Sequence, residues 1–532
     1  MKKINELNFG FSDAENYKRR ENKALFNKFF IKDIHLDELC NPSISFLIGE
    51  KGTGKTAYST YLSNNNYKDN LATTKYIRET DYTTFIKLKD AKHLTISEFS
   101  NIWKVIILLL ISQQIIEKEP KVLLEKFFNY DKFEVIKECI NEYYYNAFSP
   151  EIGQAINFAE ESKIVAELLS KFAVVKGHES NQKNFTENKI QLNLFYIQKK
   201  FQEGLSQLKL DKNHIIFIDG IDIRPHNIDY ENYLECIRGL GNAIWELNND
   251  FFPSIKGSKG RLRAVMLIRP DIFESIGLQN QNTKLRDNSV YLDWRTEYSN
   301  YRDSMLFEVI DHLLASQQDH KIFNKGEAWN HYFKWDTTNL KLSFTTPSSF
   351  IHLLRWSYYR PRDIVTFLDI LQKHLNNIPS KVEISLSDVS SPEFQRKYSI
   401  YLLGEIKDQL LFYYTLDEYE TFLKFFGFLS GKDTFNYDSY TICYNKLINY
   451  IESTDKKIPQ FMATPNDFLQ FLFDLNVICY IETGRIDGKK HFHWCFKDRN
   501  YANISPKVKT EVEYQIFTPL TKALNVGKVM NE

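Results

Sequence analysis

Short apolar runs alternate with longer segments of helical spacing over roughly the first 300 residues. The runs are short enough to be buried strands, and the segments between them carry apolar residues three or four positions apart. Strands that alternate with helices favour an α/β fold with a mainly parallel sheet covered on both faces. The strand-compatible runs lie at 44–48, 84–88, 214–218, 263–268 and 289–293.

Helical spacing dominates after residue 296, and the stretch 97–210 is too long for one crossover, so it indicates a helical insertion. Further helices are predicted over Asp13–Phe30, 348–356 and 363–374. The predicted parts are an N-terminal helical adaptor (1–38), a core (39–296), a helical lid (297–384) and a C-terminal helical and winged-helix region (385–532).

The C-terminal region resembles a winged helix. A helix is predicted over 466–475, and the β-compatible runs 477–482 and 491–497 flank a turn at Asp487-Gly488, as in a hairpin. Before it, the aromatic-rich segment Leu410–Phe426 is predicted to form one helix, and such a helix is more often part of a core than an interface.

The distribution of basic residues in this module argues against sequence-specific binding of DNA. Recognition helices usually carry Lys or Arg to phosphates, yet none occurs from Gln460 to Gly484. We therefore interpret the module as one for protein contact or packing. The alternative is contact with a nucleic-acid backbone through the wing residues Arg485, Lys489 and Lys490.

Composition excludes several classes of protein. The 68 Lys and Arg equal the 68 Asp and Glu, so no overall basic excess attracts nucleic acid or an anionic membrane. The six cysteines form no C-x-x-C pair, which argues against a zinc ribbon or a disulfide framework. The longest apolar run, Val105–Ile111, is shorter than the roughly 20 residues of a membrane helix. We therefore predict a cytoplasmic protein with no membrane partner.

The clearest chemical motif follows the first predicted strand. Gly49-Glu50-Lys51-Gly52-Thr53-Gly54-Lys55-Thr56 has the complete spacing G-x-x-x-x-G-K-[ST], and a helix-compatible segment begins at Ala57. The glycines let backbone N–H groups surround phosphates, and the positive end of the helix favours their charge. Lys55 can reach the β and γ phosphates, and Thr56 can bind Mg²⁺. We therefore predict that these residues and Ala57 bind ATP, rather than forming a chance turn.

A second motif is the apolar run that ends in Asp219-Gly220-Ile221-Asp222. It delivers Asp219 to the carboxyl edge of the sheet, where α/β folds bind ligands, so Asp219 is the predicted second metal ligand. Asp222 can orient a water for in-line attack and is the predicted catalytic carboxylate, beside Lys55. Taken alone, the run fits a solvated acidic turn equally well, and the upstream loop favours the functional interpretation.

Several arginines are candidates for contact with the γ-phosphate. Arg269 ends the fourth predicted strand, so we predict a catalytic role in sensing or neutralising that charge. The start of the predicted lid helix, at Pro361 and Arg362, resembles the sensor-2 region of related ATPases, in which a proline abuts the base and an arginine reaches the phosphates. The resemblance implies that Arg362 is a candidate sensor, although a Pro near a helix start is also ordinary initiation chemistry. Arg295 and Arg302 are possible arginine fingers toward a neighbouring subunit. Solvated helix residues are the favoured interpretation for that last pair.

Together these stretches resemble the STAND and NACHT-like branch of P-loop ATPases, and this resemblance covers residues 40–295. They are also similar to a group of bacterial P-loop ATPases. The resemblance implies a P-loop NTPase fold of the ASCE type with strand order 5-1-4-3-2. The acid that usually follows the second motif is absent, because Ile223 follows Asp222, which implies slow, regulatory hydrolysis. The residues that carry the resemblance are Gly10–Glu15, Gly49–Thr56, Asp219–Asp222, Arg269-Pro270 and Arg360–Asp363.

The resemblance implies a Mg²⁺-dependent ATPase that works as a switch. ATP would favour a homo-oligomer or engagement of a partner effector, and hydrolysis would reset the chain. Some STAND-like bacterial ATPases act in antiphage defence, so that role is expected here. One alternative is a DNA-associated ATPase similar to initiator or transposition-helper proteins, which share a P-loop core, a lid and a winged helix. A small-molecule kinase is another, because the loop alone does not distinguish water from another acceptor.

Overall fold

The contacts within the chain divide it into two compact units. The core unit comprises Ile34–Glu50 and Lys55–Leu292, and the helical unit comprises Met1–Asp33, Lys51–Gly54 and Asp293–Glu532. Lys51–Gly54 therefore belong to a different unit from the residues on either side of them. The computed structural model describes residues 1–77, 96–118, 198–222, 224, 228–320, 324–336, 348–376, 381–484, 488–500 and 503–527.

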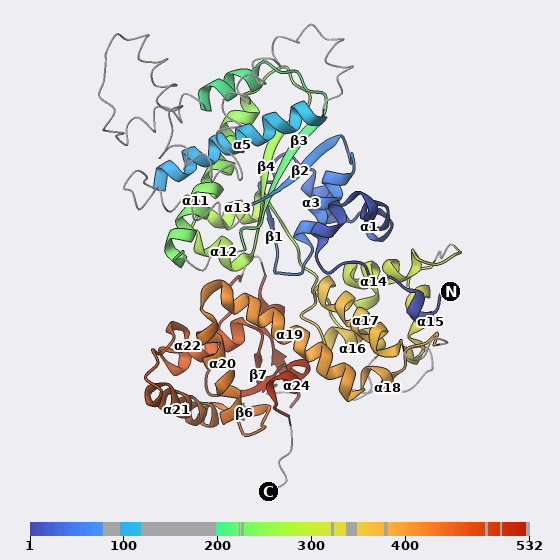
Figure 1. Cartoon of the computed structure of the whole chain (residues 1–532), viewed down its shortest axis with the longest axis vertical. Coiled ribbons are helices and arrows are strands. Elements are labelled where there is room, and N and C mark those ends of the chain that lie inside the picture. Colours follow the sequence, from blue (N-terminus) through green and yellow to red (C-terminus); the bar gives the residue numbers. More distant parts are fainter. Residues whose placement is uncertain are drawn as a thin grey trace. The chain divides into compact units, whose positions relative to one another are not determined.

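A five-stranded parallel sheet forms the centre of the core unit, so the α/β prediction is confirmed (Figure 1). Its order is β2-β3-β4-β1-β5, which is 5-1-4-3-2 when followed from the opposite edge. Every residue of β1 and β4 is buried, because helices cover the sheet, and this explains their near-continuous apolar sequence. The strands are β1 (Phe46–Ile48), β2 (Asn70–Tyr76), β3 (Asn213–Asp219), β4 (Leu262–Ile268) and β5 (Ser289–Tyr291).

Four predicted strands correspond to β1, β3, β4 and β5, with ends that differ by up to two residues. The predicted strand 84–88 lies outside the described residues. The apolar pattern did not reveal β2, which lies at one edge of the described sheet. Its buried and half-buried residues alternate at first, and its polar residues Thr73, Thr74 and Lys75 interrupt the apolar pattern. An edge strand needs no continuous apolar run, so the signal was weak.

Helices cover both faces of this sheet, with α5 and α11 on one side and α3 on the other (Figure 1). Within α5, Phe99–Lys118 is long and apolar enough to cross a membrane by length and composition, but 67% of its most apolar window is buried in the protein. It packs against α11 and β3, which accounts for its apolar sequence. The helices are α2 (Ile34–Leu39), α3 (Lys55–Asn64), α5 (Ile96–Lys118), α11 (Tyr230–Glu246), α12 (Pro270–Ser275) and α13 (Gln281–Asp287).

The backbones of α5 and α11 approach closely at Gly239. A Cβ atom on Gly239 would lie 2.6 Å from the Cβ of Phe99. We expect Gly239→Ala to lower the free energy of unfolding by about 1–3 kcal/mol, because the added methyl overpacks the contact. Gly241→Ala on the same helix is the control, because a Cβ there would meet the movable Cδ2 of Leu278 at 3.2 Å. Urea denaturation measures both variants, and equal effects would contradict the prediction.

The helical unit combines the N-terminal segment, a set of helices and a four-stranded antiparallel sheet of order β6-β9-β7-β8. The predicted helices 348–356 and 363–374 correspond to α16 and α17. The strands are β6 (Thr434–Asn436), β7 (Ile478–Thr483), β8 (Lys490–His493) and β9 (Glu513–Ile516). The helices are α1 (Lys23–Phe29), α14 (Met305–Ala315), α15 (Glu327–Tyr332), α16 (Ser349–Arg355), α17 (Pro361–Leu375), α18 (Leu386–Val389), α19 (Pro392–Tyr413), α20 (Leu416–Phe428), α21 (Tyr437–Ser453), α22 (Pro465–Asp474), α23 (Cys495–Asp498) and α24 (Thr521–Leu524).

The longest of these helices, α19, packs against α17 and α18 on the predicted lid side and against α20 and α24 on the C-terminal side. The predicted lid and C-terminal region therefore share one compact unit. A movement of α19 would reach both sets of helices.

The prediction of one helix over Asp13–Phe30 is wrong. This stretch contains two short 3₁₀ segments, Ala14–Lys18 and Arg20–Asn22, followed by α1. Arg19 is extended, with ψ at 137°, so it interrupts the helical hydrogen-bond pattern between them. Asp13 accepts a hydrogen bond from the N–H of Glu15 and caps only the first segment. Helical spacing of the apolar residues did not reveal this break.

The prediction of one helix over Leu410–Phe426 is also wrong, because α19 ends at Tyr413 and α20 begins at Leu416. Thr415 separates them with a capping box: its Oγ1 accepts from the N–H of Glu418 at 3.3 Å, and its own N–H donates to Glu418 Oε2 at 2.7 Å. Most aromatic side chains of this segment are buried, as is more common for such a helix. The buried aromatic residues are Phe412, Tyr419, Phe422, Phe425 and Phe426.

The helix and hairpin of the predicted winged helix are present as α22, β7 and β8. Arg485 and Asp487 in the connecting turn lie outside the described residues, whereas Gly488 has the positive φ of 64° that suits a tight turn. On the wing, Lys490 pairs with Glu513 of β9 at 2.8 Å. No apolar run predicted β6 or β9, which are only three and four residues long.

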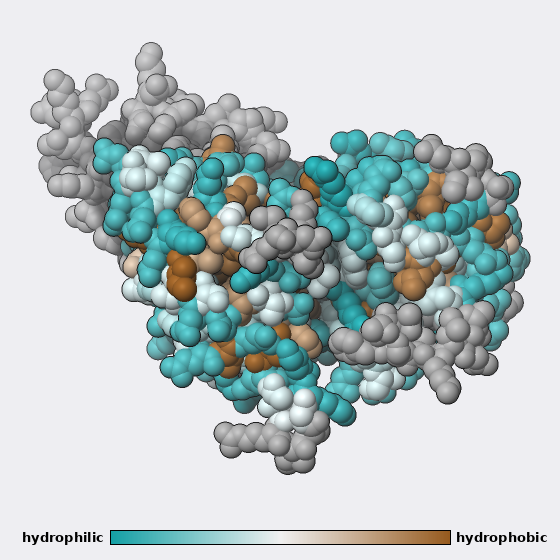
Figure 2. Space-filling view, turned by 90° about the horizontal axis from the view of Figure 1, so that it is seen from below, coloured by the Kyte–Doolittle hydropathy of each residue, from teal (hydrophilic) through white to brown (hydrophobic). Residues whose placement is uncertain are grey.

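Hydrophilic residues cover most of the surface seen in Figure 2, where hydrophobic residues form small, separated patches. Isolated hydrophobic side chains of this kind are ordinary on protein surfaces. Among the described residues, the large hydrophobic side chains that are exposed are Phe11, Ile34, Ile400, Leu416 and Ile442.

We expect His352 on α16 to make the stability of the protein depend on pH. Its ring stacks on Trp356 with centroids 5.6 Å apart, and within the described parts of the chain its Nε2 has no hydrogen-bond partner. Burial lowers the pKa of His352 from 6.5 to about 4, and the charge of Arg355 adds to this shift. Because the unfolded chain takes up this proton first, the free energy of unfolding falls as the pH drops from about 6.5 toward 4.

Replacing His352 with Gln should remove this contribution. Between pH 7 and pH 5 we expect the wild type to lose about 1–2 kcal/mol more of its free energy of unfolding than His352→Gln loses. Urea denaturation at the two pH values measures the difference. Equal losses would show that His352 does not titrate as proposed.

Candidate functional site

The glycine-rich loop leaves the sheet at the carboxyl end of β1. This strand lies between β4 and β5, and the N–H of Gly49 donates to the carbonyl of Ile268 on β4 at 3.2 Å. Helix α3 begins at Lys55, so its free N–H groups and positive dipole end are beside the last loop residues. Thr56 and Ala57 form its first turn. The predicted order of strand, loop and helix is therefore correct.

Lys55 is buried, with 8% of its surface exposed. Its Nζ donates hydrogen bonds to the carbonyls of Gly49 at 2.8 Å and Glu50 at 3.2 Å, so the ammonium curls back over the loop. Burial lowers the pKa of Lys55, and the negative charges of Asp222 and Asp219 oppose this effect. A buried ammonium with a lowered pKa gains stability when further negative charge arrives.

Thr56 and Asp219 meet at the carboxyl end of β3. Thr56 Oγ1 donates to Asp219 Oδ2 at 2.7 Å, and the N–H of Gly220 donates to Asp219 Oδ1 at 2.8 Å. Asp219 is 6% exposed. Burial raises its pKa and the nearby charge of Asp222 raises it further, while these hydrogen bonds and the charge of Lys55 lower it. A buried carboxylate is costly unless a cation compensates it, so a hydroxyl and a carboxylate placed here fit Mg²⁺.

Gly220 is required at the turn after Asp219. Its φ is 83°, and a Cβ atom there would lie 2.7 Å from the carbonyl oxygen of Ile77. Asp222 follows in the same turn and is half-buried. Its charge raises the pKa of both Lys55 and Asp219. The hydroxyl of Tyr233 on α11 bonds to the carbonyl of Ile221 and fixes this turn. The predicted catalytic carboxylate therefore lies within electrostatic reach of the predicted lysine and metal ligand.

Arg269 ends β4 as predicted, but it is not an exposed cation. It is 3% exposed, and its guanidinium pairs with Asp271, to which Nε donates at 3.1 Å. Its charge lowers the pKa of Lys55, which places it near the loop lysine. The neighbouring Asp271 neutralises part of that charge, a feature that the strand-end position alone did not reveal.

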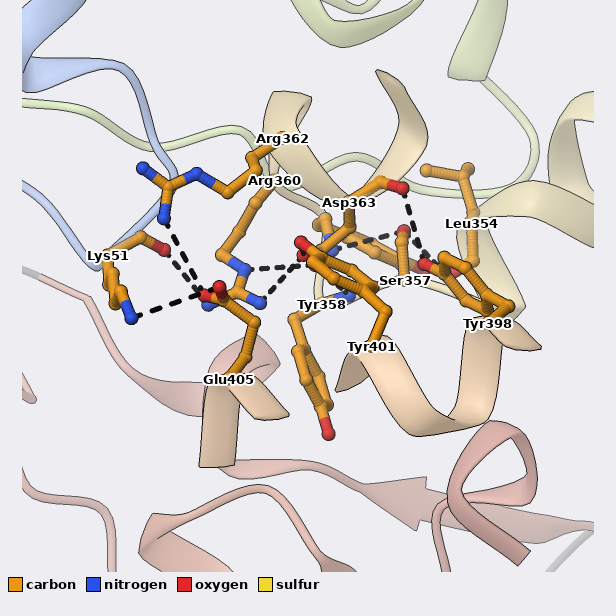
Figure 3. Close-up of polar contacts among 11 residues, drawn as sticks. Lys51, Leu354, Ser357, Tyr358, Arg360, Arg362, Asp363, Tyr398, Tyr401 and Glu405 are labelled. Carbon is orange, nitrogen blue, oxygen red and sulfur yellow. Dashed lines mark hydrogen bonds and ion pairs between the residues drawn. The ribbon is translucent and has the colours of Figure 1, made fainter. Parts of the chain in front are cut away.

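The loop tip Lys51–Gly54 contacts helical-unit residues that precede or begin α17 (Figure 3). The backbone carbonyl of Lys51 accepts a hydrogen bond from Arg360 Nη1 at 2.9 Å. Gly52 has a φ of 89°, and a Cβ atom there would lie 3.2 Å from the Cβ of Arg362. Pro361 is the first residue of α17, consistent with its predicted role at a helix start. Arg362, the predicted sensor, therefore lies against the glycine-rich loop.

Two residues that hold the loop tip had no role assigned from the sequence. One is Arg360, which also binds Asp363 through Nε at 2.9 Å and Nη2 at 2.7 Å. The other is Trp294, whose Nε1 donates to the carbonyl of Thr53 at 2.9 Å. The Arg-x-x-Asp spacing at the start of α17 was a signal for a local ion pair. No local signal indicated Trp294, because its partner is 241 residues away in the chain.

The two arginine-finger candidates are engaged within the helical unit. Arg295 Nε bonds Asp293 Oδ1 at 2.8 Å, and its Nη1 bonds the carbonyl of Lys497 at 3.0 Å. Arg302 Nη2 donates to Asn330 Oδ1 at 2.9 Å. Arg295 is nevertheless exposed, as the sequence favoured, whereas Arg302 is half-buried.

In the parts of the chain that the structure describes, no group of three or more His, Cys, Asp and Glu side chains could hold a metal ion. Mg²⁺ at a phosphate site differs, because one or two protein ligands suffice when phosphates and water supply the others. Comparison of the chain with protein-family models and with curated protein sequences finds no match.

Proposed function

We propose that the chain binds and hydrolyses ATP, with Mg²⁺, at a P-loop. The observation that carries the proposal is the 2.7 Å hydrogen bond between Thr56 and Asp219. These residues are 163 positions apart in the chain and belong to two separate motifs, the glycine-rich loop and the strand that ends at Asp219, and each is the predicted Mg²⁺ ligand of its motif. A chance glycine-rich turn gives no reason for its hydroxyl to meet the strand-end acid.

The sheet order supports a P-loop NTPase fold of the ASCE type. Strand β4 lies between β1, which precedes the loop, and β3, which carries Asp219. The loop and the acid therefore both occur at the carboxyl ends of parallel strands, where α/β sheets bind their ligands.

Each residue has a distinct task in the proposed reaction. Backbone N–H groups of the loop and of the start of α3 would bind the phosphates, and Lys55 would exchange its loop carbonyls for phosphate oxygens. Asp222 would orient the attacking water and accept its proton. Arg269 would stabilise charge on the γ-phosphate, to the extent that Asp271 leaves its charge uncompensated.

Thr56 and Asp219 are the residues that would hold Mg²⁺. The ion supplies neutralisation of phosphate charge and alignment of the phosphates when it is bound. The hydrogen bond from Thr56 Oγ1 to Asp219 Oδ2 already places these two oxygens side by side, so that one ion could contact both.

We also propose that nucleotide state controls the helical unit and, through it, a homo-oligomer or a partner effector. The contacts of Lys51 and Gly52 with Arg360 and Arg362 support this part, because the loop tip belongs to the same unit as α17 and α19. A slow, STAND-like switch in the cytoplasm, used in bacterial antiphage defence, is the proposed setting. It rests on the sequence resemblance.

Titration calorimetry of the purified chain with ATP and Mg²⁺ tests the proposal. We expect saturable uptake of about one nucleotide per chain, and free phosphate released without an added acceptor. No uptake at millimolar ATP would overturn the proposal. Phosphate transfer that needs an added small-molecule acceptor would favour a kinase, and salt-dependent DNA binding would favour the DNA-associated alternative.

A further inference from the structure

Glu405, on α19, faces two cations of the loop region (Figure 3). Its Oε1 lies 3.8 Å from Nζ of Lys51 at the loop tip, and its Oε2 lies 3.7 Å from Nη1 of Arg362 on α17. All three side chains belong to the helical unit. One carboxylate is therefore shared between the loop and the helix that lies against it.

Arg360 and Arg362 are two residues apart but are held very differently. Arg360 makes close, two-pronged hydrogen bonds to Asp363, whose side chain is fully buried. Such geometry fixes a guanidinium strongly. Arg362 pairs with Glu405 only at 3.7 Å, and its side chain is 25% exposed. Arg360 is therefore the fixed anchor of the loop, and Arg362 is the arginine whose charge can be redirected.

One oxygen of the Glu405 carboxylate is buried without a hydrogen bond among the described residues. This oxygen is Oε2, and the Glu405 side chain is 14% exposed. An incompletely bonded buried oxygen is costly, and both ion-pair distances exceed hydrogen-bond length. Lys51 has a closer partner in Asp408, at 2.7 Å, but that carboxylate is 61% exposed and therefore screened by water. Glu405 therefore holds both cations by charge rather than by close hydrogen bonds.

We propose that Glu405 is a positioning residue that competes with the phosphates of a bound nucleotide for the charges of Lys51 and Arg362. The proposal deepens the proposed function and rests on it. Phosphates at the loop carry more negative charge than one carboxylate, so binding weakens the hold of Glu405 on both cations. Because Glu405 is part of α19, the competition makes nucleotide affinity depend on where α19 lies.

Glu405→Gln tests this, because it keeps the shape of the side chain and removes its charge. We expect the Kd for ATP with Mg²⁺, measured by calorimetry, to fall about 3–10-fold, and the Kd for ADP to fall less. Glu393→Gln is the matched control, because Glu393 is on the same helix and pairs with Lys397 at 2.7 Å. The Kd of this variant for ATP should equal that of the wild type. A gain in affinity is a result that structural damage does not produce.

A double-mutant cycle isolates the cations. We compare the effect of Glu405→Gln on the logarithm of the Kd for ATP in two backgrounds. The change in the Arg362→Met background should be less than half of the change in the wild-type background. If Glu405→Gln unfolds the chain, Asp408→Asn takes its place and should tighten ATP binding by a smaller factor.

The outcomes separate the two proposals. No ATP uptake by the wild type overturns the proposed function and this inference together. Normal uptake by the wild type, with unchanged or weaker binding by folded Glu405→Gln, overturns the role of Glu405 alone. An equal gain in the wild-type and Arg362→Met backgrounds also overturns it, because the effect would then not pass through Arg362.

Discussion

Replacing Lys55 with Ala is expected to abolish measurable ATP binding by the folded chain. The wild-type ammonium is buried and donates to the carbonyls of Gly49 and Glu50, a position from which it can turn to phosphate oxygens. Charge-assisted hydrogen bonds in such a site are strong, so we expect a loss of at least about 100-fold in affinity, or about 2.7 kcal/mol. Calorimetry with ATP and Mg²⁺ measures it.

Two comparisons make the Lys55 result specific. Lys55→Met keeps most of the buried stem and should lose ATP binding just as Lys55→Ala does. Lys68→Ala removes a lysine of the same unit, 52% exposed and paired with Asp37, and should bind as the wild type does. Thermal unfolding shows whether each variant is folded. Wild-type affinity in a folded Lys55→Met variant would contradict a phosphate-binding role for the ammonium.

Asp222→Asn is expected to spare ATP binding and slow phosphate release by about 100-fold or more. The amide keeps the size of the side chain but accepts a proton poorly, and general-base catalysis contributes about 10²–10⁴-fold. Loss of the Asp222 charge also removes an influence that raises the pKa of both Lys55 and Asp219. Affinity should therefore change far less than turnover.

Asp229→Asn is the matched control for Asp222→Asn. Asp229 lies seven residues further along and caps α11 by accepting from the N–H of Asn232 at 3.0 Å, a task that asparagine performs equally well. Phosphate release by this variant should equal that of the wild type. If Asp222→Asn turned over at the wild-type rate while binding ATP, another group would have to activate the water.

The sequence predicted the central strands well and the edge strand poorly. Residues of β1, β3 and β4 are almost all buried, so their apolar runs are close to continuous. Strand β2 lies at an edge of the described sheet and carries several polar residues, so no run marked it. The two wrong helix predictions, over Asp13–Phe30 and Leu410–Phe426, share a cause. In both segments the helical spacing of apolar residues continues across the point where the helix is interrupted. The interruption is a single extended residue in the first segment and a capping box in the second.

The local parts of the candidate site follow from short stretches of sequence. Gly49–Thr56 joins a strand to a helix, and Asp219 ends a buried strand, because hydrogen bonds and backbone preferences over a few residues decide such features. The tertiary structure alone decided which charges are paired: Arg269 with Asp271, Arg360 with Asp363 and the carbonyl of Lys51, and Arg362 with Glu405. Ion pairing depends on distance and burial, and folding brings together residues as far as 309 positions apart in the chain.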